Sequence, residues 1–432
     1  MATGLKLYLK DNERYKNAER NKKMNKRMLL SALLAVVIVF TGCGAEKREV
    51  PEWIQSESIV QVPEMSEITL PDSEALDFVE SMQLGWNLGN TFDAVNCGAD
   101  NDLDYESAWC GILTTREMIA KVAEAGFKTL RLPVSWHNHM DADYTINEEW
   151  LDRVQEVVDW ALEEDMYVIL NIHHDNEEDF MYPSYDKLEQ SKKYVTRVWE
   201  QLAERFEKYN ENLIFETLNE PRQPGTDHEW WINVNSDLGK ECMDCINQLN
   251  QAAVDAIRGN GSKYNTSRYI MVPGYCASAD FVLADGFTLP DDANASKENR
   301  ILVSVHAYTP YFFALAGESE ANSTDYFSIE AKKGTGDIDS FMKKLYDKFI
   351  SNGIGVVIGE FGSRNKQNNL DSRIEHAAYY VAVARHYGMT TCWWDNNAFT
   401  GEGENFGLLR RRQNEFLFPQ IVAQMVHYSK AE

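Results

Sequence analysis

The sequence has little positive charge, and this shortage limits the partners that it can bind. Its 432 residues include 42 Lys and Arg against 68 Asp and Glu, a formal net charge of −26 at pH 7. The first 43 residues carry nine basic and three acidic side chains, so this excess of six positive charges leaves −32 on the remainder. Such a field repels nucleic acid and anionic lipid. We expect neither as a partner, whereas a neutral polymer tolerates this charge.

Cysteine is also scarce, with seven in the chain. Cys242 and Cys245 have the spacing of a zinc or redox pair, but no second such pair exists and they lie in a helix-like acidic stretch. The acidic run 100–104 lacks the glycine of a calcium loop and is typical of a solvated loop. We therefore expect no metal and no cofactor. Cys97 and Cys110 bracket a loop, and a disulfide between them is a hypothesis that spacing cannot establish.

Long apolar runs are absent, and the longest, residues 28–40, is too short to span a bilayer. It follows a basic cluster and precedes small residues and Cys43, a pattern that resembles a bacterial lipoprotein signal with Cys43 as the lipidated residue. Phe40 stands where that motif prefers a smaller aliphatic residue, so ordinary secretion stays open. The sequence predicts an extracellular protein of a bacterium that contacts a membrane only through a lipid anchor at Cys43.

Three segments are expected along the chain. Residues 1–43 form an N-terminal extension and export signal, and residues 44–72, which are polar and contain three prolines, form a tether. Residues 73–432 form one domain with no low-complexity tract and no appended carbohydrate-binding module. Strand-like runs alternate with amphipathic helical windows throughout this domain. The strands are expected at 82–88, 128–132, 167–172, 213–218, 269–272, 301–305, 355–358 and 390–394.

Eight alternations of strand and helix in about 350 residues fit one architecture better than others. They favour an α/β fold, a (β/α)₈ TIM barrel, over a doubly wound open sheet. In such a barrel the C-terminal ends of all strands face one mouth, where the chemistry is assembled.

Two of the expected strands deliver a glutamate to that mouth. The run 213–218 leads to Glu220 and stops at Pro221, which cannot donate a ladder hydrogen bond, so Glu220 is expected at the lip of the strand. The run 355–358 leads to Glu360. Two carboxyl groups on strand ends are the minimum equipment for cleaving a glycosidic bond. Structural ion pairs are the alternative interpretation for each glutamate alone.

Other strand ends add polar and aromatic side chains. Arg131 could neutralise a buried acid, with Glu360 as the candidate. His173 and His174 are expected to point to opposite faces of a strand, so they should not share a metal. Trp394 is either core or a platform for a sugar ring. The full set of candidates is Asn87, Asn90, Arg131, His173, His174, Asn219, His306, Tyr308, Trp393 and Trp394.

Seven motifs occur in order, at residues 86–90, 131–136, 171–174, 218–221, 305–308, 359–362 and 393–396. Together they resemble family 5 of the glycoside hydrolases, and most closely its subfamily 4 of bacterial endo-β-1,4-glucanases. The resemblance covers about residues 75–425. The segment Glu106-Ser107-Ala108-Trp109-Cys110-Gly111 departs from the family pattern by inserting Cys110, which puts the shape of that loop in doubt.

The resemblance implies a retaining mechanism without a metal. It makes Glu220 the acid/base and Glu360 the nucleophile, so the pKa of Glu220 is expected to be raised. The same resemblance gives Asn219 a hydrogen bond to the sugar 2-hydroxyl and Arg131 a pairing with the nucleophile. The further residues expected to bind substrate or support catalysis are Asn87, Trp136, His173, His174, His306, Tyr308 and Trp394. Trp109 and His137 are additional sugar-subsite candidates, and Tyr311, Phe312 and Phe313 are either an aromatic wall or a loop anchor.

The leading interpretation is therefore a monomeric, extracellular endo-β-1,4-glucanase that acts on a β-linked polysaccharide. Xyloglucan, mixed-linkage glucan, xylan or mannan as the main substrate is the alternative within the same chemistry. A surface lipoprotein that binds polysaccharide without cleaving it is the alternative from another class. Retention of Glu220 together with Glu360 argues against the binder.

Overall fold

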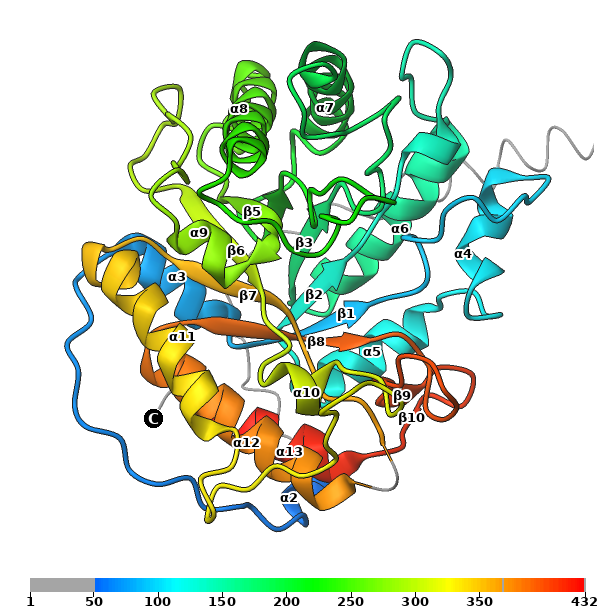
Figure 1. Cartoon of the computed structure of the whole chain (residues 1–432). Coiled ribbons are helices and arrows are strands. Elements are labelled where there is room, and N and C mark those ends of the chain that lie inside the picture. Colours follow the sequence, from blue (N-terminus) through cyan, green and yellow to red (C-terminus); the bar gives the residue numbers. More distant parts are fainter. Residues whose placement is uncertain (1–50, 367–368, 431–432) are drawn as a thin grey trace, which may run out of the picture. The chain divides into compact units, whose positions relative to one another are not determined.

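The computed structural model describes residues 51–366 and 369–430, so the predictions for the export signal and Cys43 lie outside the described residues. Eight parallel strands close into a barrel in which each strand pairs with the next and β8 pairs with β1 (Figure 1). This confirms the predicted (β/α)₈ barrel. The strands are β1 (Leu84–Leu88), β2 (Thr129–Leu132), β3 (Tyr167–Asn171), β4 (Leu213–Glu216), β5 (Ile270–Ser278), β6 (Ile301–His306), β7 (Val356–Phe361) and β8 (Thr390–Asp395).

Helices surround the barrel and follow the strands in alternation (Figure 1). Several begin at a side-chain cap, because the first amides of a helix lack partners. Thr115 accepts from Met118 N, and Ser236 accepts from Gly239 N. The main helices are α3 (Glu74–Met82), α5 (Arg116–Glu124), α6 (Glu148–Glu163), α7 (Leu188–Arg205), α8 (Asp237–Gly259), α9 (Ala279–Leu283), α11 (Thr335–Lys348), α12 (Leu370–His386) and α13 (Pro419–Ser429). Shorter helical turns are α2 (Glu52–Gln55), α4 (Tyr105–Ala108) and α10 (Tyr311–Ala314).

The inside of the barrel changes from apolar to polar within one step along the strands. Its lower layer is apolar and packs against α3, which contributes Ala75, Val79 and Met82. The strand residues of this layer are Ile169, Ile214, Met271, Leu302, Val357 and Cys392. Since side chains alternate along a strand, the next inward positions lie two residues further on. Three of these positions carry Asn171, Glu216 and Ser304, so polar side chains lie directly above the apolar layer.

Two segments differ from the predicted organisation. The sequence also predicts a last helix from about residue 414 to residue 428, but that helix begins at Pro419, because the preceding residues form the short hairpin β9 (Leu409–Arg410) and β10 (Glu415–Phe416). Within the predicted tether, the described part from residue 51 packs on the domain. Val60 N donates to Gln424 Oε1 at 2.9 Å, and the Trp53 ring stacks on Phe416. Backbone groups of this segment are paired by α13, so the segment is not free in the way that a tether would be.

The described residues contain no helix that is long and apolar enough to cross a membrane. Cys97 and Cys110 are both free thiols, so the hypothesis of a disulfide between them is wrong for this structure. Cys242 and Cys245 are also free and lie buried in α8. Burial raises the pKa of each of these two thiols to about 12. They are therefore protonated core residues.

Gly85 of β1 has no room for a side chain. A Cβ at this position would lie 2.2 Å from Cys392 Sγ and 2.9 Å from Cys392 Cβ on the neighbouring strand β8. We expect Gly85→Ala to lower the free energy of unfolding by about 1–3 kcal/mol, since overpacking forces the strands apart. Urea denaturation followed by tryptophan fluorescence measures this loss. Gly336→Ala, in α11 with nothing within 4 Å, is the control and should not destabilise the protein.

Candidate active site

The two predicted glutamates lie at the polar end of the barrel. Glu360 is part of β7, one residue before the strand ends. Glu220 lies four residues beyond β4, which ends at Glu216 and not at Pro221. The intervening segment is nevertheless fixed, because Thr217 N donates to Met271 O at 2.9 Å and Cys276 N donates to Pro221 O at 3.1 Å. Glu220 is thus held on the loop between β4 and α8 and not on the strand itself.

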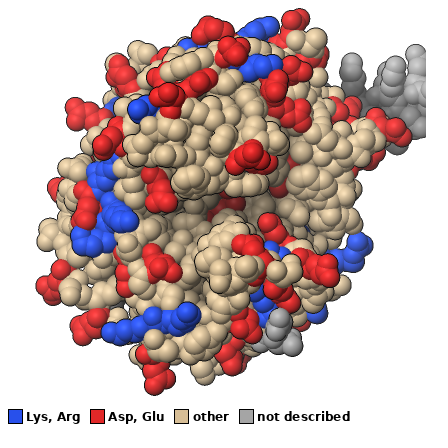
Figure 2. Space-filling view, in the orientation of Figure 1, with Lys and Arg blue, Asp and Glu red and all other residues tan. Residues whose placement is uncertain are grey.

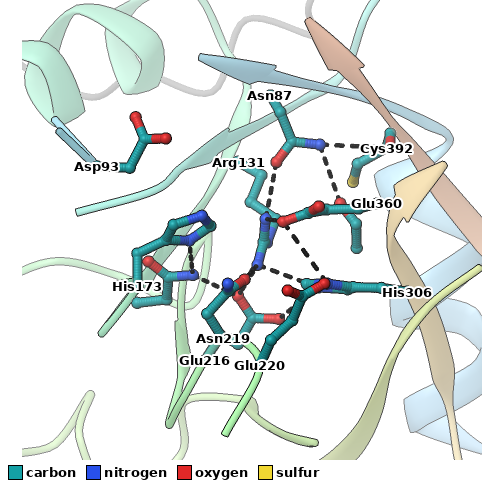
Figure 3. A network of polar contacts seen from close by, with 12 residues as sticks. Asn87, Asp93, Arg131, His173, Glu216, Asn219, Glu220, His306, Glu360 and Cys392 are labelled. Atoms are coloured by element: carbon teal, nitrogen blue, oxygen red, sulfur yellow. Dashed lines mark hydrogen bonds and ion pairs between the residues drawn. The ribbon is translucent and has the colours of Figure 1, made fainter. Parts of the chain in front are cut away.

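Arg131 of β2 is the centre of the polar network (Figure 3). Its guanidinium is completely buried and donates from all three nitrogens. Nη1 donates to Glu360 Oε1 at 2.7 Å, and Nε donates to Glu216 Oε2 at 2.8 Å. Burial disfavours the charge of Arg131, but the two carboxylates outweigh this effect and raise its pKa above the ordinary value. The cation therefore stays charged and holds Glu360 in place.

Glu216 is a site residue that the sequence interpretation missed. It is fully buried and accepts from Ser304 Oγ at 2.5 Å and from Asn171 Nδ2 at 2.9 Å, in addition to Arg131. Its signal in the sequence is a charged residue inside the buried run 213–216, since a buried charge requires a partner. Alternation along β4 also places it above Ile214, facing inward. With Glu216 present, two carboxylates share one guanidinium.

Glu220, His306 and Glu360 converge on one point (Figure 3). His306 Nδ1 lies 2.8 Å from Glu220 Oε1 and 3.6 Å from Glu360 Oε1. One donor atom from each of the three residues lies within 4.8 Å of the others. This proximity of two carboxylates is close to the separation of about 5–5.5 Å that a retaining glycosidase needs.

The contacts of His306 assign its tautomer. Arg131 Nη2 lies 3.2 Å from His306 Nε2, and because arginine has only donors, Nε2 accepts. Nδ1 then carries the proton and donates to Glu220. Burial by itself raises the pKa of Glu220, but the hydrogen bond that His306 donates and the charge of Arg222 lower it to about 2. The expectation of a raised pKa is therefore wrong for the unliganded site, because the sequence did not reveal the donors that surround this carboxylate.

Three predicted residues support the two glutamates. Tyr308 Oη donates to Glu360 Oε2 at 2.8 Å, so both oxygens of Glu360 are hydrogen bonded. Asn219 Oδ1 accepts from Arg131 Nη2 at 2.7 Å. Asn87 accepts from Arg131 Nη1 at 2.9 Å and donates to Gly359 O at 2.9 Å. Asn87 therefore positions Arg131, and both its amide oxygen and its amide nitrogen are hydrogen bonded within the protein.

His173 and His174 follow β3 on its connecting loop, so the alternation expected for a strand does not apply. Their rings lie 4.4 Å apart, and both offer a nitrogen near Asp93 (Figure 3 shows His173 and Asp93). The prediction that they face apart is therefore wrong. Burial lowers the pKa of His174 to about 4 and that of His173 well below its ordinary value, so both rings are neutral. The Asp93 carboxylate is satisfied by Asn90 N and Thr91 N.

The structure distinguishes the two adjacent tryptophans of β8. Trp393 is completely buried and donates from Nε1 to Phe406 O at 2.9 Å. The Trp394 ring lies parallel to His173, with planes 3° apart and centroids 5.8 Å apart. A side chain at Gly89 would come within 2.7 Å of the Trp394 ring, so this glycine provides its space. Trp394 is thus the tryptophan of the pair that lies at the mouth.

Some aromatic candidates are not placed to contact a substrate. Trp136 is completely buried and donates from Nε1 to Asn171 O at 2.9 Å, so its predicted role in a sugar subsite is wrong. His137 is also buried, and its Nδ1 lies 2.6 Å from Asp175 Oδ1. Trp109 keeps an exposed fraction of 43%, and Tyr311 and Phe312 keep 48% and 43%. These three remain available at the surface, whereas Phe313 is core.

The surface around the strand ends is hollowed. Figure 2 shows a hollow over the barrel strands with acidic side chains on its floor and mainly uncharged atoms around it. Acidic residues are frequent around the rest of this face (Figure 2). A hollow of this kind accommodates an uncharged polymer more readily than a polyanion.

The low pKa of Glu220 makes the free energy of unfolding depend on pH. Because this pKa is about 2 in the folded protein against an ordinary value of 4.5, the carboxylate stabilises the fold above pH 4.5, and this contribution disappears as the pH falls toward 2. We expect the difference in free energy of unfolding between the wild type and Glu220→Gln to shrink over that interval. Urea denaturation at several pH values measures it. A difference that grows on acidification would contradict the assignment.

Replacing Glu216 tests the shared guanidinium. In Glu216→Gln, one oxygen and one amide nitrogen face three donors, from Arg131, Asn171 and Ser304. We expect the free energy of unfolding to fall by about 3 kcal/mol, since breaking a buried charge pair leaves the partner uncompensated. Chemical denaturation checks this value. The matched control is Glu204→Gln on the exposed face of α7, which should stay close to the wild type.

Comparison with known proteins agrees with this geometry. Residues 92–400 match the family model described as Cellulase (glycosyl hydrolase family 5). Endoglucanase A of Clostridium longisporum is 42% identical over 351 residues, which cover 80% of this chain and 64% of that protein. This chain therefore spans less than two thirds of the length of that relative.

Solved structures of similar proteins align with this chain over the whole length of the solved chain. A family 5 lichenase from Caldicellulosiruptor sp. F32 is 51% identical, with a TM-score of 0.83 over 86% of this chain and 100% of that chain. A broad-specificity endoglucanase of family 5 subfamily 4 from Clostridium acetobutylicum is 41% identical, with a TM-score of 0.73 over 82% of this chain and 100% of that one. With the family model matching most of the barrel, this chain belongs to glycosyl hydrolase family 5.

Proposed function

We propose that the protein is a retaining endo-acting glycoside hydrolase that cleaves internal β-1,4-glucosidic bonds of cellulose or a related β-glucan. The observation that carries this proposal is the convergence of Glu220 and Glu360 on His306 Nδ1, at 2.8 and 3.6 Å. Two carboxylates this close can act on the same glycosidic bond, one as the nucleophile at the anomeric carbon and the other as the proton donor to the leaving oxygen. The lichenase neighbour has also been solved as a variant with cellotetraose, a β-glucan fragment, which supports the same substrate class.

In the first step, a carboxylate oxygen of Glu360 attacks the anomeric carbon while the bond to the leaving oxygen breaks. Glu220 gives a proton to that oxygen, and a covalent ester forms between the sugar and Glu360. Arg131 and Tyr308 hold both oxygens of Glu360, so the nucleophile is oriented before substrate arrives. Asn219 has no hydrogen bond from its amide nitrogen within the described residues, so this group is available to the sugar 2-hydroxyl.

In the second step, Glu220 accepts a proton from water, whose oxygen attacks the anomeric carbon and releases the Glu360 carboxylate. Two inversions give net retention. Glu220 must begin protonated, although its pKa in the unliganded site is about 2. A sugar chain that displaces water from Glu220 adds desolvation, which disfavours its charged form and raises its pKa toward the working range.

Replacing either glutamate tests these roles. We expect Glu360→Ala and Glu220→Ala each to lose several orders of magnitude in turnover of a soluble β-glucan, because each removes a group that acts on the reacting atoms. Reducing-sugar release measures turnover, and circular dichroism checks that the fold survives. Azide should restore activity to Glu360→Ala with an inverted glycosyl azide as product. Full activity in either variant would overturn the assignment.

A panel of substrates distinguishes the alternatives. Mixed-linkage glucan is the first alternative to cellulose, because one solved neighbour is a lichenase and another has broad specificity. Rates on carboxymethylcellulose, barley glucan, xyloglucan, xylan and glucomannan, with sizing of the products, rank these polymers. Failure to release reducing sugar from any of them would favour a polysaccharide-binding protein. Lipid attachment at Cys43, export and the monomeric state stay predictions.

A further inference from the structure

Two tryptophans that no motif includes are the most exposed large apolar side chains of the described residues. Trp230 and Trp231 have exposed fractions of 62% and 67%. They lie on the loop between β4 and α8, in an otherwise polar stretch. An indole left in water forgoes the free energy that its burial would contribute. Exposed apolar surface of this kind can mark an interaction site, and here two such residues are consecutive in the chain.

The loop that carries the two indoles is anchored to the barrel. Tyr275 Oη donates to His228 O at 2.9 Å, and Cys276 Sγ lies 3.2 Å from Glu229 O. Both anchors belong to β5. Immediately after the pair, Ile232 is buried in the core with an exposed fraction of 3%. The indoles are thus fixed on both sides and exposed by the fold.

Arg222 connects this loop to the reacting end of the site. Its Nη1 lies 3.6 Å from Glu220 Oε2 and donates to Glu220 O at 3.1 Å. The guanidinium carbon lies 4.2 Å from the centroid of the Trp230 ring, a cation–π contact. One face of Trp230 is therefore covered by Arg222. From Glu220 through Arg222 to Trp230, the contacts form one continuous line.

The position of this line indicates which part of the substrate lies beside it. Trp394 and His173 lie at the ends of β8 and β3, whereas Trp230 follows β4 and is anchored on β5. Since Glu220 is the group that delivers a proton to the leaving oxygen, the surface that extends beyond Glu220 faces the sugars that depart. The sugar attacked by Glu360 lies on the other side of that oxygen.

We propose that Trp230 and Trp231 form a platform that binds the leaving-group side of a β-glucan chain. This inference rests on the proposed function and adds the part of the substrate that these residues recognise. Each indole is uncharged and flat, and it suits the C–H faces of β-linked glucose units on an otherwise acidic surface. Binding of such remote sugars stabilises the transition state at the reacting bond, so it should raise kcat/KM for long substrates.

Trp231→Ala tests the platform on two substrates that differ only beyond the scissile bond. Cellohexaose places sugars on the leaving side, whereas the leaving group of β-cellotriosyl fluoride is a single fluoride ion that reaches no platform. We expect kcat/KM to fall about tenfold on cellohexaose and to stay within twofold on the fluoride. Trp231→Phe, which keeps a smaller flat ring, should recover part of the loss. Transfer of the cellotriosyl group to an added cellobiose acceptor should fall in parallel.

The possible outcomes distinguish failure of this inference from failure of the proposed function on which it rests. If the wild type turns over neither substrate, the proposed hydrolase and the platform both fall. If the wild type is active and Trp231→Ala matches it on cellohexaose and in transfer to cellobiose, the platform alone is overturned. An equal loss on both substrates would also overturn it, because such a loss places the effect on the fold or on the reacting groups.

Discussion

One buried guanidinium determines the arrangement of this site. Arg131 has no exposed surface, so its charge must be compensated inside the barrel. Two carboxylates do this, Glu216 at 2.8 Å and Glu360 at 2.7 Å. The geometry is tight, because a side chain at Gly359 would lie within 3.4 Å of Arg131, His306 and Glu216. Asn87, Asn219 and His306 also contact this cation, and Tyr308 and Glu220 bond to groups that do.

The two carboxylates bound to Arg131 differ in what else surrounds them, and this difference separates a structural acid from a reactive one. Both oxygens of Glu216 are taken by Arg131, Asn171 and Ser304 in the closed interior. Glu360 lies one layer higher, at the start of the hollow, with a small exposed fraction of 5%. The same cation therefore binds both, but only the upper one reaches a substrate.

Much of the fold was predictable because each element has a local signal. The strands of the barrel are apolar runs between amphipathic helices, and the ends of the helices carry caps such as Thr115 and Ser236. The boundary at Pro419 was missed, since the hairpin before it is made by pairing that no periodicity reveals. The packing of residue 60 against α13 was missed for the same reason, because its partner lies 364 residues away.

The site was predictable where a motif fixes a residue on a strand and less so elsewhere. Glu360 and Arg131 lie within strands, so their register follows from the sequence. His173 and His174 lie just past a strand, and the rule of alternation failed there. Trp136 has the aromatic ring of a sugar platform, but only the fold shows that it is buried. Burial of an individual side chain depends on distant neighbours, which is why the exposed indoles also escaped notice.

The protonation of Glu220 ties the loop after β4 to the chemistry. In the open site its carboxylate is stabilised by His306 at 2.8 Å and lies 3.6 Å from Arg222. Arg222 is also the residue that covers one face of Trp230. Sugars bound along this loop would exclude water from the same carboxylate, and exclusion of water disfavours its charge. Binding on the leaving side and protonation of the leaving oxygen are then two consequences of filling one surface, which is why the proton donor belongs on the loop and the nucleophile on the strand.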